Sequence, residues 1–208
     1  MKKDTIYSIL FYIVGIIILS FGITMLLLSD FGVGPWDAFF VGLYNQFGLT
    51  VGSWIFIVGV ILVFVNSYLL KSRINLPSLL TFFITGLFID FWMLIVFDHV
   101  VITDTIFQVA LLIFGIICMG VGIGSYMQLE IARNPIDNLM IAVNYRTGLS
   151  LALSKMSLEL MALLLAFIIK GPIGIGTFVI ALGIGPLVQF FYHWFKSMKG
   201  SFKKATQS

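Results

Sequence analysis

Two aspartates lie one hundred positions apart in matching surroundings. Asp37 and Asp137 each follow a proline by two residues, and each opens a short run, 35–47 and 135–146, that closes on Gly-Leu and a hydroxyl residue. Proline at the first helical position and a carboxylate in the first turn both favour a helix start. Such a pair could bind a proton or a cation, or orient polar groups along a pathway. The alternative is that each carboxylate accepts backbone N–H bonds at its helix terminus.

A second charged pair lies inside an apolar stretch. Lys155 and Glu159 are four residues apart, and this spacing puts them on one face of a helix. Charges at membrane depth are costly and usually face a bundle interior or a wet cavity. The pair could therefore form an ion-coupled site, with Glu159 as the carrier and Lys155 tuning it. It could also be a self-neutralised structural pair, with Lys155 extending to the membrane surface.

Three further polar residues are candidates for a substrate or ion pathway. Arg133 and Asn134 precede the second short run, where a cation beside the positive end of a helix dipole could hold an anion. The plainer role of Arg133 is a cytoplasmic surface charge. Asp90 lies within an apolar stretch and could line a pathway or make structural hydrogen bonds. Three amides could line a path or bond between helices: Asn66, Asn138 and Gln189.

The composition predicts the surroundings of these residues. The chain of 208 residues is 60% hydrophobic and 10% charged, with a mean hydropathy of +1.11, whereas soluble domains are about 25% charged. We therefore expect an all-α polytopic membrane protein. Six stretches are long enough for the roughly 20 helical residues of a span, the first without a signal-peptide cleavage site and the last interrupted at 183–186: 6–28, 51–70, 77–97, 105–128, 151–169 and 177–195.

The two short runs, at about eleven residues, cannot cross a hydrocarbon core and are predicted to be re-entrant half-helices. Basic residues then gather on one side with both termini, and the positive-inside rule makes that side cytoplasmic. Acidic loop residues lie outside, with Lys170 as an exception. The cytoplasmic set is Lys2, Lys3, Lys71, Arg73, Arg133, Arg146 and the lysines of the basic tail.

The short runs belong to a longer repeat. At an offset of one hundred and without gaps, ten positions recur in the second half: Ile13, Gly15, Ile16, Ile17, Gly22, Ile23, Pro35, Asp37, Gly48 and Leu49. Each unit, 1–100 and 101–208, holds three spans and one half-helix. Because three is odd, the second unit enters the membrane inverted, an arrangement that points to a transport site near the midplane.

The motifs resemble a known family. Gly-Val-Gly-Pro-Trp-Asp at 32–37, Gly-Leu-Thr-Val-Gly at 48–52 and Gly-Pro-Ile-Gly-Ile-Gly-Thr at 171–177 are similar to those of the bacterial YczE/YyaS-like integral membrane proteins, which are related to the YitT-type proteins. The resemblance implies a bacterial plasma-membrane protein and little about activity. One departure is Ala-Arg-Asn at 132–134, where the first half has a glycine-rich turn.

The sequence predicts a small-solute transporter or channel, with proton coupling through Glu159 or the Asp37/Asp137 pair as one option. The alternative is a non-transporting membrane scaffold or regulatory subunit, which would have a dry, packed centre. No catalytic motif, metal-ligand spacing, cofactor fingerprint or nucleic-acid signal is present, so we expect no enzyme, cofactor or metal. The expected partners are the lipid bilayer, a small solute or ion, and further copies of the chain in a homo-oligomer.

Overall fold

A computed structural model describes residues 2–129 and 133–205, and the side chains of residues 6–129 and 133–198. Every regular element in these ranges is helical. Several residues discussed above have side chains outside the described part: Lys2, Lys3, Ala132, Lys199, Lys203 and Lys204. In chain order the elements are α1 (Lys2–Ser29), α2 (Pro35–Phe47), α3 (Val51–Leu70), α4 (Leu76–Phe91), η1 (Trp92–Val96), α5 (Thr105–Tyr126), α6 (Pro135–Thr147), α7 (Leu151–Ile168) and α8 (Ile175–Ala205).

Six of the helices are long and apolar enough to cross a membrane, as the hydropathy predicts. The helices α2 and α6, of 13 residues each, are not among them. Local chemistry sets their ends. Each has proline in its first turn, and each stops at a glycine, Gly48 or Gly148, whose φ of 74° or 72° ends an α-helix at little cost. Thr50 and Ser150 then cap the following helices.

The third span extends over Leu76–Val96, close to the predicted range, and its last turn is π-helical, with Phe97 N–H donating to the Trp92 carbonyl at 2.8 Å. One expectation about helix shape is wrong. The sixth span is not interrupted at 183–186, since α8 runs through Pro186 to Ala205. A continuous helix loses only the bond that proline cannot donate, whereas a break in lipid would leave several backbone groups unpaired.

The helices α1 and α5 cross in contact through glycines. The backbone carbonyl of Gly122 lies 2.8 Å from the position that a Cβ on Gly15 would occupy, and the carbonyl of Gly115 lies 2.9 Å from the same position on Gly22. The reverse contacts also occur. A Cβ on Gly115 would lie close to the Gly22 carbonyl, and a Cβ on Gly122 would lie close to the Gly15 carbonyl. Small residues let the two backbones approach this closely. The crossing is therefore antiparallel and reciprocal.

The glycine pair at 120 and 124 has a different neighbour. Gly120 packs against Leu187, and Gly124 packs against Phe191 and Tyr192. This small-residue face of α5 is therefore covered by α8 of the same chain.

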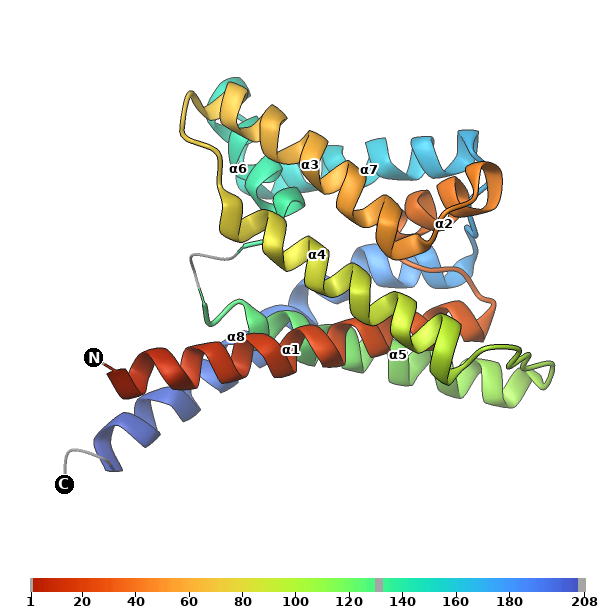
Figure 1. Ribbon diagram of the computed structural model, residues 1–208, viewed down its shortest axis with the longest axis horizontal. Coiled ribbons are helices and arrows are strands. Elements are labelled where there is room, and N and C mark those ends of the chain that lie inside the picture. The colour runs from red at the N-terminus through yellow and green to blue at the C-terminus, as the bar shows by residue number, and fades with distance from the viewer. Residues whose placement is uncertain (1, 130–132, 206–208) are drawn as a thin grey trace.

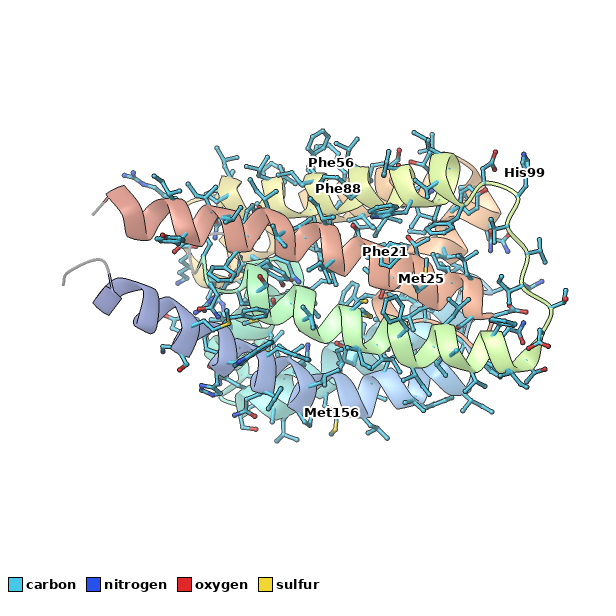
Figure 2. The ribbon with its side chains drawn as sticks, turned by 90° about the horizontal axis from the view of Figure 1, so that it is seen from below. Phe21, Met25, Phe56, Phe88, His99 and Met156 are labelled. Atoms are coloured by element: carbon cyan, nitrogen blue, oxygen red, sulfur yellow. The ribbon has the colours of Figure 1, made fainter. Side chains whose placement is uncertain are left out.

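The remaining helices are arranged around the α1–α5 pair. Figure 1 shows α2, α3, α6 and α7 on one side of it, with α4 crossing in front. Figure 2, from below, shows α1, α5 and α8 side by side. The short helix α2 packs on α7, and the short helix α6 packs on α3; each also packs on the helix that follows it in the chain. The two short helices thus join the two halves of the sequence.

Both termini lie at one end of the molecule, and the loop containing His99 lies at the other (Figures 1 and 2). The short helix α6 is nearer the terminal end, and α2 is nearer the opposite end (Figure 1). One pair of helices packs differently in the two halves of the chain. The helix α4 packs along α3, but among the described residues α8 makes almost no contact with α7.

Candidate functional site

The start of α6 is held by a closed set of hydrogen bonds. Asn134 caps the helix, its Oδ1 accepting from the Asp137 backbone N–H at 2.8 Å. The Asn134 amide donates to the Tyr126 hydroxyl at 3.1 Å, and that hydroxyl donates to Asp137 Oδ2 at 3.3 Å. Tyr126 is only 1% exposed. The carboxylate of Asp137 is therefore fixed by a buried tyrosine, and it is Asn134 that caps the helix.

The start of α2 lacks all of these bonds. Gly34 occupies the cap position and makes no side-chain cap bond. The position of a Cβ on Gly34 would be 2.9 Å from Asp37 Oδ2, so the glycine leaves room for this carboxylate. Among the described residues, no group hydrogen-bonds to the Asp37 side chain. Beside it, the indole N–H of Trp36 is also buried without a partner. The two aspartates, alike in sequence, thus differ in their surroundings.

The helix α7 connects these two starts electrostatically. Lys155 Nζ lies 3.4 Å from Glu159 Oε1, one helical turn away. Glu159 interacts electrostatically with both Asp37 and Asp137. Asp137 in turn interacts with Lys155 and Arg133. We call these five residues, Asp37, Arg133, Asp137, Lys155 and Glu159, the charge cluster.

The charge cluster contains three carboxyl groups and two cations. Fully ionised, it would carry one more negative charge than positive charge. The two cations lie nearest Glu159 and Asp137, whereas the charge that acts on Asp37 is that of another carboxylate, Glu159. Asp37 is therefore the group of the cluster that lacks a compensating partner.

Most of the predicted site residues are linked by hydrogen bonds or electrostatic interactions, and one is not. Asp37, Asp137, Glu159, Lys155, Arg133 and Asn134 interact in this way, whereas Asp90 has other contacts. Asp90 accepts from the Thr50 hydroxyl at 2.6 Å and from the Gly52 backbone N–H at 2.8 Å. These are the contacts of a carboxylate that caps the start of α3 from the neighbouring helix α4.

Sequence reasoning missed two buried groups near the site. Tyr126 ends α5 and gave no signal apart from its place beside the turn before Asn134. Ser154 lies one residue before Lys155, and its hydroxyl is buried without a hydrogen-bond partner. Serine is common at helix contacts in membranes, so its type alone could not single it out. In the described part of the chain, no three His, Cys, Asp or Glu side chains gather as a metal site.

The fold and the cluster together define a class. The chain is a polytopic helical membrane protein in which interacting charged groups lie at the starts of two helices that are too short to span and on α7. It belongs to the DUF6198 family, a family of unknown function, whose model matches residues 6–193.

Two similar proteins come from Bacillus subtilis (strain 168). The chain is 36% identical over 182 residues to an uncharacterized protein, YyaS, covering 88% of this chain and 90% of that one. It is 33% identical over 191 residues to an uncharacterized membrane protein, YczE, covering 91% and 87%.

A third relative is an uncharacterized protein of Haemophilus influenzae, 30% identical over 174 residues, or 84% of this chain and 78% of that one. No solved structure matches the chain. The resemblance to YczE/YyaS-like proteins is thereby confirmed.

Proposed function

We propose that the protein is a small-solute transporter of the bacterial plasma membrane, and that its coupling ion, a proton or a monovalent cation, binds at Asp37. The observation that carries this proposal is the uncompensated Asp37 carboxyl within a cluster that has one surplus negative charge. Intramembrane charges mark ion pathways and proton relays. A bound proton or cation would balance the cluster, and its release would leave the surplus charge again.

The proposal includes an inverted repeat with re-entrant half-helices. Three observations support it: helix bounds that correspond at an offset of one hundred, the reciprocal glycine contacts of α1 and α5, and the matched packing of α2 on α7 and α6 on α3. Reciprocal contacts, in which i meets j and j meets i, are those of a two-fold axis. Half-helix starts facing one another at mid-depth form transport sites in other inverted-repeat folds.

The topology follows from the same picture. Both termini lie at one end of the molecule (Figure 1), as six spans and two half-helices require. The positive-inside bias of Lys71, Arg73, Arg133 and Arg146 makes that end cytoplasmic. Compartment-specific labelling of tags at the two termini checks this, and tags found on opposite sides of the membrane would contradict it.

Reconstitution tests the coupling. In proteoliposomes that contain either a pH-sensitive or a Na⁺-sensitive dye, an imposed membrane potential should drive proton or Na⁺ entry together with one member of a broad solute panel. Asp37→Asn should abolish the coupled ion flux. Asp30→Asn is the matched control, because Asp30 lies in an exposed turn outside the cluster and has a positive φ that asparagine tolerates.

The alternative, a non-transporting scaffold, has one observation in its favour. The cavity described in the next section is lined neither by Asp37 nor by Asp137 nor by Glu159. A scaffold predicts no flux of any solute and equal thermal stability with and without every member of the panel. That result, obtained with protein that is folded in the liposomes, would replace the transport proposal.

A further inference from the structure

A polar cavity lies between α3, α4 and the start of α6. Its volume is about 360 Å³, within the range of small-molecule sites. Apolar side chains such as Leu70 and Pro77 form part of its wall. The polar residues of its lining are Asn66, Ser67, Ser72, Arg73, Asn75 and Asn138. The chain elements that enclose it meet near the end of the molecule that carries both termini (Figure 1).

Asn66 has an unpaired acceptor. Its side-chain amide donates to the Pro135 carbonyl at 2.8 Å, while its Oδ1 is buried and has no hydrogen-bond partner. The residue is 6% exposed. The orientation of the amide is fixed, because a proline carbonyl can only accept. A buried carbonyl oxygen normally has a partner, but this oxygen is closed off from the cavity as well as from solvent, so Asn66 braces the cavity wall and offers no bond to a ligand.

Arg73 supplies the charge. It is exposed, and it makes no ion pair with any carboxylate of the described residues. No acidic side chain lines the cavity. Asn75 and Asn138 each use one amide atom on Ser78, at 3.2 Å to its backbone N–H and 3.0 Å to its hydroxyl. The other atom of each, one donor and one acceptor, remains for a ligand.

The fold itself does not require this polar lining. At the matching positions of the other half stand residues without polar side chains: Ala166 for Asn66, Ile173 for Arg73, Ile175 for Asn75 and Ala38 for Asn138. The helices there still form and pack. The polar groups are therefore a property of this cavity, and not of the repeated unit.

We propose that the cavity binds a small anion that also carries hydroxyl groups, of the glycerol-phosphate type. The anionic group pairs with Arg73, and the hydroxyl groups bond to the spare amide nitrogen of Asn75 and the spare amide oxygen of Asn138. The same chemistry is presented by a free phosphate ester and by the headgroup of phosphatidylglycerol, since basic pockets at a cytoplasmic surface bind lipid headgroups. The inference concerns binding and does not depend on transport.

Binding to the purified full-length protein in phospholipid-free detergent tests the soluble source. Glycerol 3-phosphate should bind and raise the thermal midpoint, whereas glycerol, which lacks the anion, should not. Native mass spectrometry from nanodiscs of phosphatidylcholine, with and without phosphatidylglycerol, tests the lipid source. Binding in the first experiment assigns the cavity to a solute, and retention of phosphatidylglycerol in the second assigns it to a headgroup.

Variants locate the site. Arg73→Gln should weaken binding about tenfold or more, because it removes a charge-assisted pair. Lys71→Gln is the matched control, two residues away and not part of the lining, and it should leave binding unchanged. Asn138→Ala should weaken binding of the hydroxylated anion. Absence of binding by both probes, or equal effects of the Arg73 and Lys71 variants, would overturn the proposal.

Discussion

At the scale of single residues, the partner of a carboxylate matters more than its sequence context. Asp37 and Asp137 occupy equivalent places after equivalent prolines. Asp137 has the Tyr126 hydroxyl and two cations near it, whereas the charge acting on Asp37 is that of another carboxylate. Two sequence differences account for this. The position of Asn134, which caps α6, is occupied in the first half by Gly34, and the position of Tyr126, which donates to Asp137, is occupied by Leu26.

Neutralising the two aspartates should therefore have opposite effects on stability. Asp37→Asn loses no hydrogen bond and removes repulsion from Glu159, so the free energy of unfolding should stay equal or rise. Asp137→Asn gives up a charged acceptor and its attraction to Lys155, and should lower that free energy by about 1 kcal/mol. Thermal unfolding of both variants in one detergent decides the matter. The reverse ranking would show that our assignment of partners is wrong.

Tyr126→Phe tests the bonds at the start of α6. Without the hydroxyl, the Asn134 amide and one Asp137 oxygen both lose a partner at a buried position. We expect the free energy of unfolding to fall by about 1–3 kcal/mol. Tyr145→Phe, on the exposed face of the same half-helix (67% exposed), serves as the control and should have no effect. Equal midpoints for the two variants in a thermal melt would speak against the bonds described.

At the scale of elements, glycines decide how closely the half-helix α2 joins the second half of the chain. A Cβ on Gly42 would lie 2.6 Å from the Ile169 side chain, and a Cβ on Gly171 would collide with the Ala38 carbonyl. The loop before α2 meets the loop before α8 in the same way, through Gly32 and Gly174. This junction is therefore sealed by backbone contacts, at the end of the molecule opposite the termini.

Gly171→Ala should disturb this seal. The added methyl group must displace the start of α2 or the end of α7, at a cost of about 1–3 kcal/mol in stability. Gly183→Ala provides the comparison, because nothing lies within 4 Å of its Cβ position. The comparison variant should unfold at the wild-type temperature. If both alanine variants melt together at that temperature, the junction is looser than described.

Apolar periodicity and turn chemistry were enough to place the helices. Six spans, two short helices and the stops at Gly48 and Gly148 all follow from local signals. The π-helical turn after Phe91 does not, since it coincides with long-range contacts of Trp92 with Ser20 and Phe21. The continuous α8 also escaped prediction, because the Gly-Pro rule derived from water overstates how readily a helix breaks in lipid.

The candidate site could be predicted in part. The repeated sequence pattern pointed to Asp37 and Asp137, and the high cost of burying charges at membrane depth pointed to Lys155 and Glu159. The contacts that separate the two aspartates cross between helices, as do those that place Asp90 at a helix cap. Such contacts between helices cannot be predicted from the spacing of residues along the chain. The cavity beside Arg73 was missed because its lining comes from three helices and a loop.

At the scale of the whole molecule, the two halves of the chain differ in how their helices pack. The helices α3 and α4 are in contact, with the rings of Phe56 and Phe83 5.5 Å apart. Their counterparts at an offset of one hundred, Met156 and Gly183, belong to α7 and α8, which hardly touch. If the protein transports, a second conformation could have α7 packed on α8 and α3 separated from α4. This exchange would open the site to the other side of the membrane.

Paired cysteines can follow that exchange. In a Cys118→Ala background, Phe56→Cys with Phe83→Cys should join readily through a short thiol cross-linker in the resting protein. The pair Met156→Cys and Gly183→Cys should give a low cross-linking yield at rest, and a yield several times higher under an imposed ion gradient. Under the same gradient, the yield of the first pair should fall. A gradient that leaves both yields unchanged would count against the exchange.

The reciprocal contact of α1 and α5 limits the movements that remain. Carbonyl oxygens of each helix lie against glycines of the other, so sliding along the helix axes would drive side chains into the partner's backbone. If the protein transports, these two helices would therefore move as one body, and access to either side of the bilayer would depend on how the remaining helices tilt against them.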